Sequence, residues 1–287
     1  MTALLNRRNL LAAAAVASLA LGLAPVAQAE TKLVLSSWLP PKHPIVVGAI
    51  KPWAKQVEEV TEGRVKVRVL AKPLGAPPAH YDMAKDGVAD ITYGLHSFTK
   101  DDRFLRSRIG QFSFLGDDAV PASKAFWDVY AGSLDAQAEH QGVKLLGLFV
   151  HGPGIFHNNV RKIEAPDSFA GLKIRVPGGI YNTTWFLVMN ESKWNALSAE
   201  DRAAIEGVSG AAFAELVGQA WNGADEKAIP KIEGDGIEIY DAPASVLEAI
   251  KTAAAKHEAA WADAVGKAGF DGSAALADFR KQTGQTN

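Results

Sequence analysis

The sequence predicts an α/β fold organised around a largely parallel β-sheet. Residues 33–95 alternate strand-like and helix-like segments, in the order strand, helix, strand, helix, strand. One of these segments, Arg64–Leu70, alternates charged and apolar residues with a period of two, as a half-buried strand does. Strands that are joined through helices lie parallel in one sheet, because their crossover connections are right-handed.

Local signals define the other elements in this first part of the chain. The apolar side chains of the first helix recur at helical spacing, and the glycine that follows ends it. These elements are a strand at 33–38, a proline-rich loop at 39–44, a helix at 45–61, a short helix at 80–85 and a strand at 91–95.

The downstream half is richer in helix. Ser198, followed by Glu200 and Asp201 in the first turn, is typical of a helix start. The expected elements are a long helix at 122–140, a strand at 144–150, a strongly apolar strand at 181–190, a helix that starts at Ser198 and runs past Trp221, and a largely helical tail at 244–279.

Residues 1–29 have the pattern of an export signal. Arg7-Arg8 precede an apolar run, and Ala27-Gln28-Ala29 matches an A-x-A cleavage site. We therefore expect cleavage after Ala29 and a periplasmic location for the mature chain. The paired arginines are similar to a twin-arginine signal, although a Sec signal that contains two arginines also explains them.

Composition excludes several classes of site. The chain has no cysteine, which rules out thiol nucleophiles, thiolate metal sites and disulfides. Its formal charge of −2 becomes −4 without the leader, which holds two arginines and no acid, and the basic residues are scattered, so no nucleic-acid partner is expected. No zinc or calcium spacing, phosphate loop or Gly-x-Ser-x-Gly motif occurs, so we expect neither a cofactor nor a metal.

One short strand carries a candidate ligand contact. Residues 166–177 read as a helical turn, a glycine stop and a strand in which Arg175 stands between Ile174 and Val176. Arg175 then faces the side opposite to its two neighbours. A guanidinium fixed in this way suits a carboxylate, but a solvated arginine on an edge strand has the same pattern.

A set of motifs identifies a family. In chain order they are LSSWLPPKHP (35–44), DMAKDGVADI (82–91), FLGDD (114–118), GLKIRVP (171–177), and VMN (188–190) followed by WNAL (194–197). Together they resemble the periplasmic solute-binding subunits of tripartite ATP-independent periplasmic (TRAP) transporters, the dicarboxylate-receptor-like (DctP) family. The motifs extend over nearly the whole mature chain, in the family's order.

The resemblance implies a fold and a function. The fold is a solute-binding domain over residues 30–287, made of two interleaved α/β lobes, with a long hinge helix that starts near Ser198. The function is that of a receptor without catalytic activity, which binds a small organic acid and delivers it to the membrane subunits of the transporter. Arg175 matches the family arginine that pairs with the ligand's carboxylate.

The chain departs from the family directly after Pro177. Where family members continue through most of their second lobe, this chain passes at once to the segment that follows that lobe. The second lobe is therefore expected to be incomplete, truncated between 177 and 180. Such a gap would expose strand edges and apolar surface. In addition, a second family arginine is replaced by the run His151-Gly152-Pro153-Gly154.

Five other residues are candidate ligand contacts. Ligands of open α/β folds bind where parallel strands end, and Trp38, Tyr93 and His96 stand at such ends. His151 and His157 flank the Gly-Pro-Gly loop. Each of the five is equally explained as a core residue or a structural hydrogen-bond partner.

Two other functions stay open beside the receptor. A family member with such a gap could be a remnant that is exported but no longer binds a ligand. A secreted hydrolase with His151 or His157 as its base is the alternative from another class, but no nucleophile occurs at a recognisable spacing.

Overall fold

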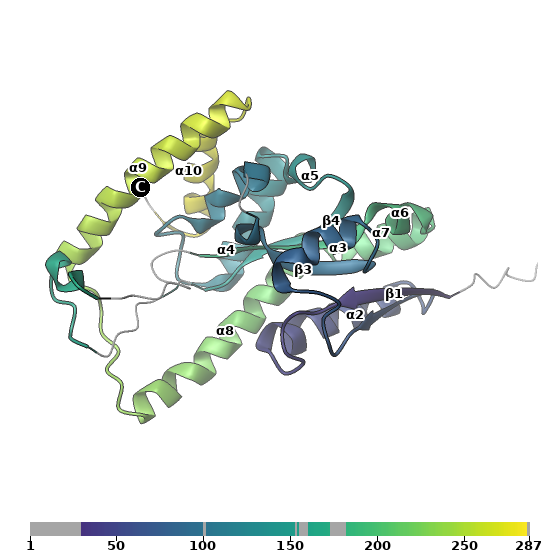
Figure 1. Ribbon diagram of the computed structural model, residues 1–287, viewed down its shortest axis with the longest axis horizontal. Helices are drawn as coiled ribbons and strands as arrows, with labels where there is room; N and C mark the ends of the chain where they lie inside the picture. The colour runs from purple at the N-terminus through teal and green to yellow at the C-terminus, as the bar shows by residue number, and fades with distance from the viewer. Residues whose placement is uncertain (1–29, 100–101, 153, 155–159, 173–181, 286–287) are drawn as a thin grey trace, which may run out of the picture. The chain divides into compact units, whose positions relative to one another are not determined.

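The sheet of this protein has five strands in the order β2-β1-β3-β5-β4 (Figure 1). The computed structural model describes residues 30–99, 102–152, 154, 160–172 and 182–285, and from Thr31 onward the chain forms one compact unit. The strands are β1 (Thr31–Ser36), β2 (Val65–Val69), β3 (Ile91–Leu95), β4 (Val143–Val150) and β5 (Thr184–Asn190).

The predicted parallel arrangement is confirmed for the first three strands. β1 lies parallel to both β2 and β3. β5 differs, because it is inserted between β3 and β4 and runs antiparallel to both of them. All seven residues of β5 are buried, which explains its nearly uniform apolar sequence.

Helices cover the sheet and form most of the second half of the described chain. The α-helices are α2 (Lys51–Val60), α3 (His80–Lys85), α4 (Ala119–Phe126), α5 (Ala136–Glu139), α6 (Glu191–Ala196), α7 (Ala199–Gly207), α8 (Ala211–Gly234), α9 (Ala244–Lys267) and α10 (Gly272–Gln282). Short 3-10 segments lie at Pro77–Ala79, His96–Phe98, Asp102–Phe104, Arg106–Gln111 and Pro166–Phe169, and π-helical segments at Val46–Ile50 and Trp127–Ser133.

Two long helices expected from the sequence are interrupted. The stretch 122–140 is divided into α4, a π-helical segment and α5, whose cap Asp135 has a φ of 46° and accepts a hydrogen bond from the Ala138 N–H. The helix that Ser198 caps, α7, ends at Gly207. Gly210, with a φ of 59°, then redirects the chain into α8, so the long helix begins at Ala211 rather than near Ser198.

Side chains along β5 alternate between the two faces of the sheet and contribute to the apolar cluster on each face. Trp185 and Leu187 join a first apolar cluster with β1, α2 and α8. Phe186 and Val188 join a second cluster with α4, α9 and α10. Successive strand residues point to opposite faces, so this one strand belongs to both cores.

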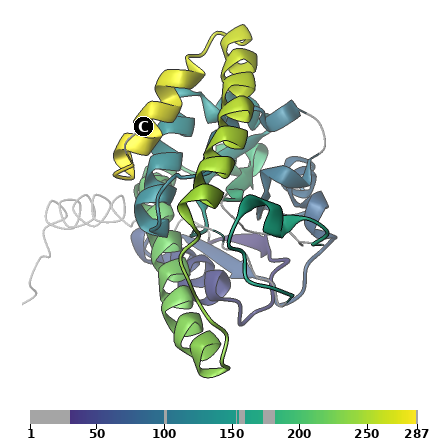
Figure 2. The same ribbon diagram turned by 90° about the vertical axis from the view of Figure 1, so that its left-hand side faces the viewer.

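The two 24-residue helices, α8 and α9, differ in how they are packed. The first half of α8 lies against α4, whereas nearly all of its residues from Asp225 onward are exposed (Figure 1). α9 lies beside α10 in both views of the chain (Figure 2). Within the described residues, no helix combines the length and the hydropathy needed to cross a membrane.

Candidate ligand-binding site

The candidate site lies at the edge of the sheet where β1, β3 and β4 end. Because β5 is antiparallel to its neighbours, its first residues lie at this same edge. Trp185 is paired with Leu95 of β3 on one side and with Phe149 of β4 on the other. Trp38 follows the end of β1. Carboxyl ends of parallel strands are where open α/β folds bind ligands.

Three aromatic rings form a stack at this edge. The rings of Trp38 and Trp185 are 5.5 Å apart and inclined by only 8°, and those of Trp185 and Phe149 are 5.4 Å apart at 17°. Phe98 meets Trp38 edge-on at 5.6 Å. We call Trp38, Trp185 and Phe149 the aromatic stack. Phe149 is fully buried and Trp38 is half-buried, so Trp38 is the accessible end.

Tyr93 fixes the position of Trp38. The Trp38 Nε1–H donates to the Tyr93 carbonyl oxygen at 3.1 Å, and the Tyr93 hydroxyl is 2.6 Å from the Ser37 Oγ. Burial raises the pKa of Tyr93, which keeps its hydroxyl protonated. Tyr93 itself is fully buried. Tyr93 therefore supports the stack through its hydrogen bond with Trp38. Its direct contact with a ligand stays a prediction.

His151 joins the end of β4 to the start of β5. Its Nε2 accepts a hydrogen bond from the Thr183 N–H at 3.1 Å, and its Nδ1 contacts the Gly152 carbonyl oxygen. Burial lowers the pKa of His151, which favours the neutral ring that these two contacts require. With both nitrogens engaged, the ring has none free to act as the base of the hydrolase alternative.

Trp221 extends the candidate site onto α8. His43 and His151 each meet the Trp221 ring edge-on, at 5.8 Å and 5.9 Å. Trp221 packs against the same apolar cluster as Trp38 and Trp185. The indole N–H groups of Trp185 and Trp221 are both buried, and neither has a hydrogen-bond partner among the residues that the structure describes.

His96 lies apart from the other candidates. It is 2% exposed, in the second apolar cluster on the opposite face of the sheet, where its Nε2 is 3.1 Å from the Nε2 of His140. Phe104 and Phe186 meet its ring edge-on. The structure thus brings together Trp38, Tyr93 and His151 but not His96, whose role as a ligand contact stays a prediction. Arg175 and His157 lie outside the described residues.

Sequence reasoning missed Trp185 and Trp221. Trp185 was expected only as part of an apolar strand, and Trp221 only as part of a helix. Their sequence neighbours give no signal for a site, because the stack depends on the register between β4 and β5, including the irregularity between Leu145 and Gly147.

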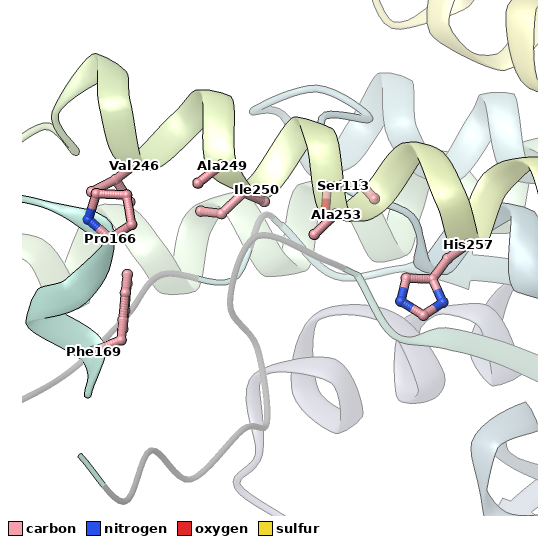
Figure 3. A pocket seen from close by; sticks show the side chains of 9 residues that line it. Ser113, Pro166, Phe169, Val246, Ala249, Ile250, Ala253 and His257 are labelled. Carbon is pink, nitrogen blue, oxygen red and sulfur yellow. The ribbon is translucent and has the colours of Figure 1, made fainter. Parts of the chain in front are cut away.

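An apolar groove of about 420 Å³ lies elsewhere, along α9 (Figure 3). Val246, Ala249, Ile250 and Ala253 of α9 face Pro166 and Phe169 across it, and Ser113 and His257 also line it. None of the residues of the aromatic stack contributes to this groove.

Comparisons with known proteins assign the chain to a family. The model of the family described as bacterial extracellular solute-binding protein, family 7 (DctP), matches residues 35–186 and 179–263. The chain belongs to this family. An outer membrane transporter protein, TsaT, of Comamonas testosteroni is 29% identical over 335 aligned positions, which cover 96% of this chain and 98% of that protein.

Solved structures agree with this family assignment. A TRAP periplasmic solute-binding protein from Bordetella bronchiseptica, with bound (R)- and (S)-mandelate, is 31% identical, covers 88% of this chain and 99% of its own, and has a TM-score of 0.80. A TRAP solute-binding protein from Rhodoferax ferrireducens, at 24% identity and a TM-score of 0.75, shares the fold. The predictions of a DctP-family receptor and of a periplasmic-binding-protein-like α/β fold are confirmed.

Proposed function

We propose that this family 7 protein is a receptor that captures a small organic acid outside the cytoplasm and delivers it to the membrane subunits of a TRAP transporter, without catalysing a reaction. The observation that carries this proposal is the 31% identity, over 88% of the chain, with a receptor that holds mandelate, an organic acid. The aromatic stack lies where such a fold binds its ligand. Cleavage after Ala29 and release into the periplasm belong to the same proposal.

Replacing Arg175 with alanine is the first test. We expect an acid such as mandelate to raise the melting temperature of the mature wild-type protein, and the R175A variant to bind the same acid at least tenfold more weakly, because a bidentate pair with the carboxylate is lost. Differential scanning fluorimetry with increasing acid measures both effects.

The matched control is Arg68→Ala. Arg68 is exposed on β2, an edge strand of the sheet, and belongs to none of the family motifs, so its removal should leave ligand-induced stabilisation unchanged. Equal stabilisation of the wild type and R175A by the same acid would show that Arg175 is not the carboxylate partner.

A second candidate function, that of a remnant that binds weakly or not at all, is favoured by the alignments. The alignment with the Comamonas protein has 335 positions, whereas 96% of 287 residues is about 276, so about 59 positions lack a counterpart in this chain. The family model also matches as two segments that overlap at 179–186. Both facts support a deletion between 177 and 180.

Two described segments, near residues 160–163 and 237–240, leave apolar side chains exposed. Lys162 pairs with Glu238 at 2.6 Å, and the Ile163 N–H donates to the Tyr240 hydroxyl at 2.9 Å. The segments at 162–163 and 238–240 are therefore bonded to each other. Nearby, Val160 is 68% exposed and Ile237 55%. Exposed apolar side chains of this kind are expected where a second-lobe sheet has been lost.

Restoring the lost segment distinguishes the receptor from the remnant. A chimera that carries the corresponding segment of the Bordetella protein between Pro177 and Ile180 should bind mandelate at least tenfold more tightly than the natural chain, because a closed cleft contacts the ligand from two sides. Calorimetric titration measures the affinity, after chromatography and thermal unfolding have shown that both proteins are monodisperse and folded. Equal affinities would argue against the remnant.

A further inference from the structure

We propose that the aromatic stack recognises an aromatic monocarboxylate, whose ring packs against Trp38 and one of whose oxygens accepts a hydrogen bond from the Trp185 Nε1–H. This inference rests on the proposed receptor function and specifies its substrate class. It is carried by the geometry of the described tryptophans.

The first argument is the unpaired donor of Trp185. Its side chain is 5% exposed, yet within the described part of the chain its N–H has no partner. Three other tryptophans have paired N–H groups: Trp38 donates to the Tyr93 carbonyl, Trp53 to the Ser209 hydroxyl and Trp261 to the Leu105 carbonyl. A buried donor without an acceptor destabilises the folded protein, and native structures pair nearly all such groups. An acceptor that arrives with a ligand accounts for the exception.

The second argument is the shape of the stack. Near-parallel rings present a flat apolar wall, and its end, Trp38, is half-buried. A planar aromatic ring can extend such a stack, whereas a saturated ring or an open chain forms fewer close contacts with it. The hydrogen bonds of Trp38 and Tyr93 hold this wall in place before a ligand arrives.

The third argument concerns charge. Trp221 supplies a second buried indole N–H that has no partner among the described residues, and its ring packs against the same apolar cluster. Asp225 lies one helical turn after Trp221, and its carboxylate is close to Gly152 and interacts with His151. While Asp225 is ionised, its charge disfavours every carboxylate, and a dicarboxylate more than a monocarboxylate, so a monoanion is the less disfavoured ligand.

The variant Trp185→Phe tests the donor directly. Phenylalanine keeps an aromatic ring in the stack and removes only the N–H and the second ring of the indole. We expect its affinity for benzoate and mandelate to fall about tenfold, or 1.4 kcal/mol. The melting temperature without ligand should fall, because the smaller ring leaves a cavity in the core, but the lost N–H should add little to this fall, since it has no partner among the described residues.

Trp261→Phe is the matched control. Trp261 is 5% exposed like Trp185, but it lies in the other apolar cluster and its N–H is paired with Leu105. This variant should lower the melting temperature of the free protein and leave affinity unchanged. Trp38→Leu, at the half-buried end of the stack, is a second test of the ring contact should Trp185→Phe fail to fold, and it should also weaken benzoate binding about tenfold.

The probes are benzoate and mandelate, with cyclohexanecarboxylate and succinate as the saturated and dicarboxylate comparisons, each titrated calorimetrically. Tighter binding of the aromatic acids, weakened by Trp185→Phe and by Trp38→Leu, supports the inference. If the saturated acids bind as tightly as benzoate, or if both variants bind benzoate as the wild type does, the inference is wrong while the receptor function stands. If none of the four acids binds, the receptor function and the inference fail together.

Discussion

Replacing Gly218 with alanine is expected to lower the free energy of unfolding by about 3 kcal/mol, whereas the same change at Gly223 on the same helix should raise it by about 0.5–1 kcal/mol. Both glycines lie within α8. Helix propensity alone predicts that alanine stabilises either position. The opposite signs therefore isolate the packing of α8 against α4.

The difference comes from what a Cβ atom would meet. At Gly218 it would lie 2.5 Å from the Val120 Cα and 2.8 Å from the Ala119 carbonyl oxygen, both of them backbone atoms of α4. Backbone cannot move aside as a flexible side chain can, so α8 has to shift away from α4. At Gly223, apart from the adjacent backbone of α8 itself, no atom of the described residues lies within 4 Å of the added Cβ.

Urea unfolding of the two variants, followed by circular dichroism, measures both changes. Because Trp221 lies one turn beyond Gly218 on α8, G218A should also weaken binding of an acid ligand, while G223A should not. A G218A variant as stable as the wild type would mean that α8 and α4 are less closely packed than the structure shows.

Most of the sheet could be predicted from the sequence, because periodicity reveals where a strand lies. It does not reveal strand direction. β5 is an apolar run whose seven residues are all buried, and this pattern is the same for a parallel and an antiparallel strand. Its position between β3 and β4 depends on contacts between residues far apart in the sequence, because its side chains pack into both apolar clusters.

The candidate site shows a similar limit. Tyr93 and His96 both stand at the end of β3, and the sequence offers them as equivalent contacts. They are three positions apart, so the two-residue period of a strand places them on opposite faces, and the structure has Tyr93 in the first cluster and His96 beside His140. Trp185 and Trp221 could not be identified, because their significance lies in missing hydrogen bonds, which only the folded arrangement reveals.

Acid is expected to destabilise this protein through the buried pair His96 and His140. His140 is fully buried, and its Nδ1–H donates to the Ala136 carbonyl oxygen at 2.7 Å, which leaves its Nε2 to accept from the His96 Nε2–H. Burial lowers the pKa of His140 from 6.5 to about 4, and burial followed by the proximity of His140 lowers that of His96 well below its usual value.

The direction of this pH effect depends on whether the folded or the unfolded state binds more protons. Below pH 6.5 the unfolded chain takes up protons on these histidines while the folded protein keeps them neutral, so falling pH favours unfolding. The stabilisation is complete above pH 6.5 and is lost as the pH falls toward 4. For His140 alone, the difference between 6.5 and about 4 corresponds to about 3 kcal/mol.

Urea unfolding at pH 7.5 and pH 4.5, with the wild type and a His140→Asn variant, measures this effect. The variant should be less stable than the wild type at pH 7.5, because it loses the contact with His96, but its stability should fall less between the two pH values. His257→Asn is the control, because His257 is exposed on α9 and does not belong to the buried pair. If H140N loses as much stability on acidification as the wild type and H257N do, the acid sensitivity arises elsewhere in the chain, and the buried pair is not its source.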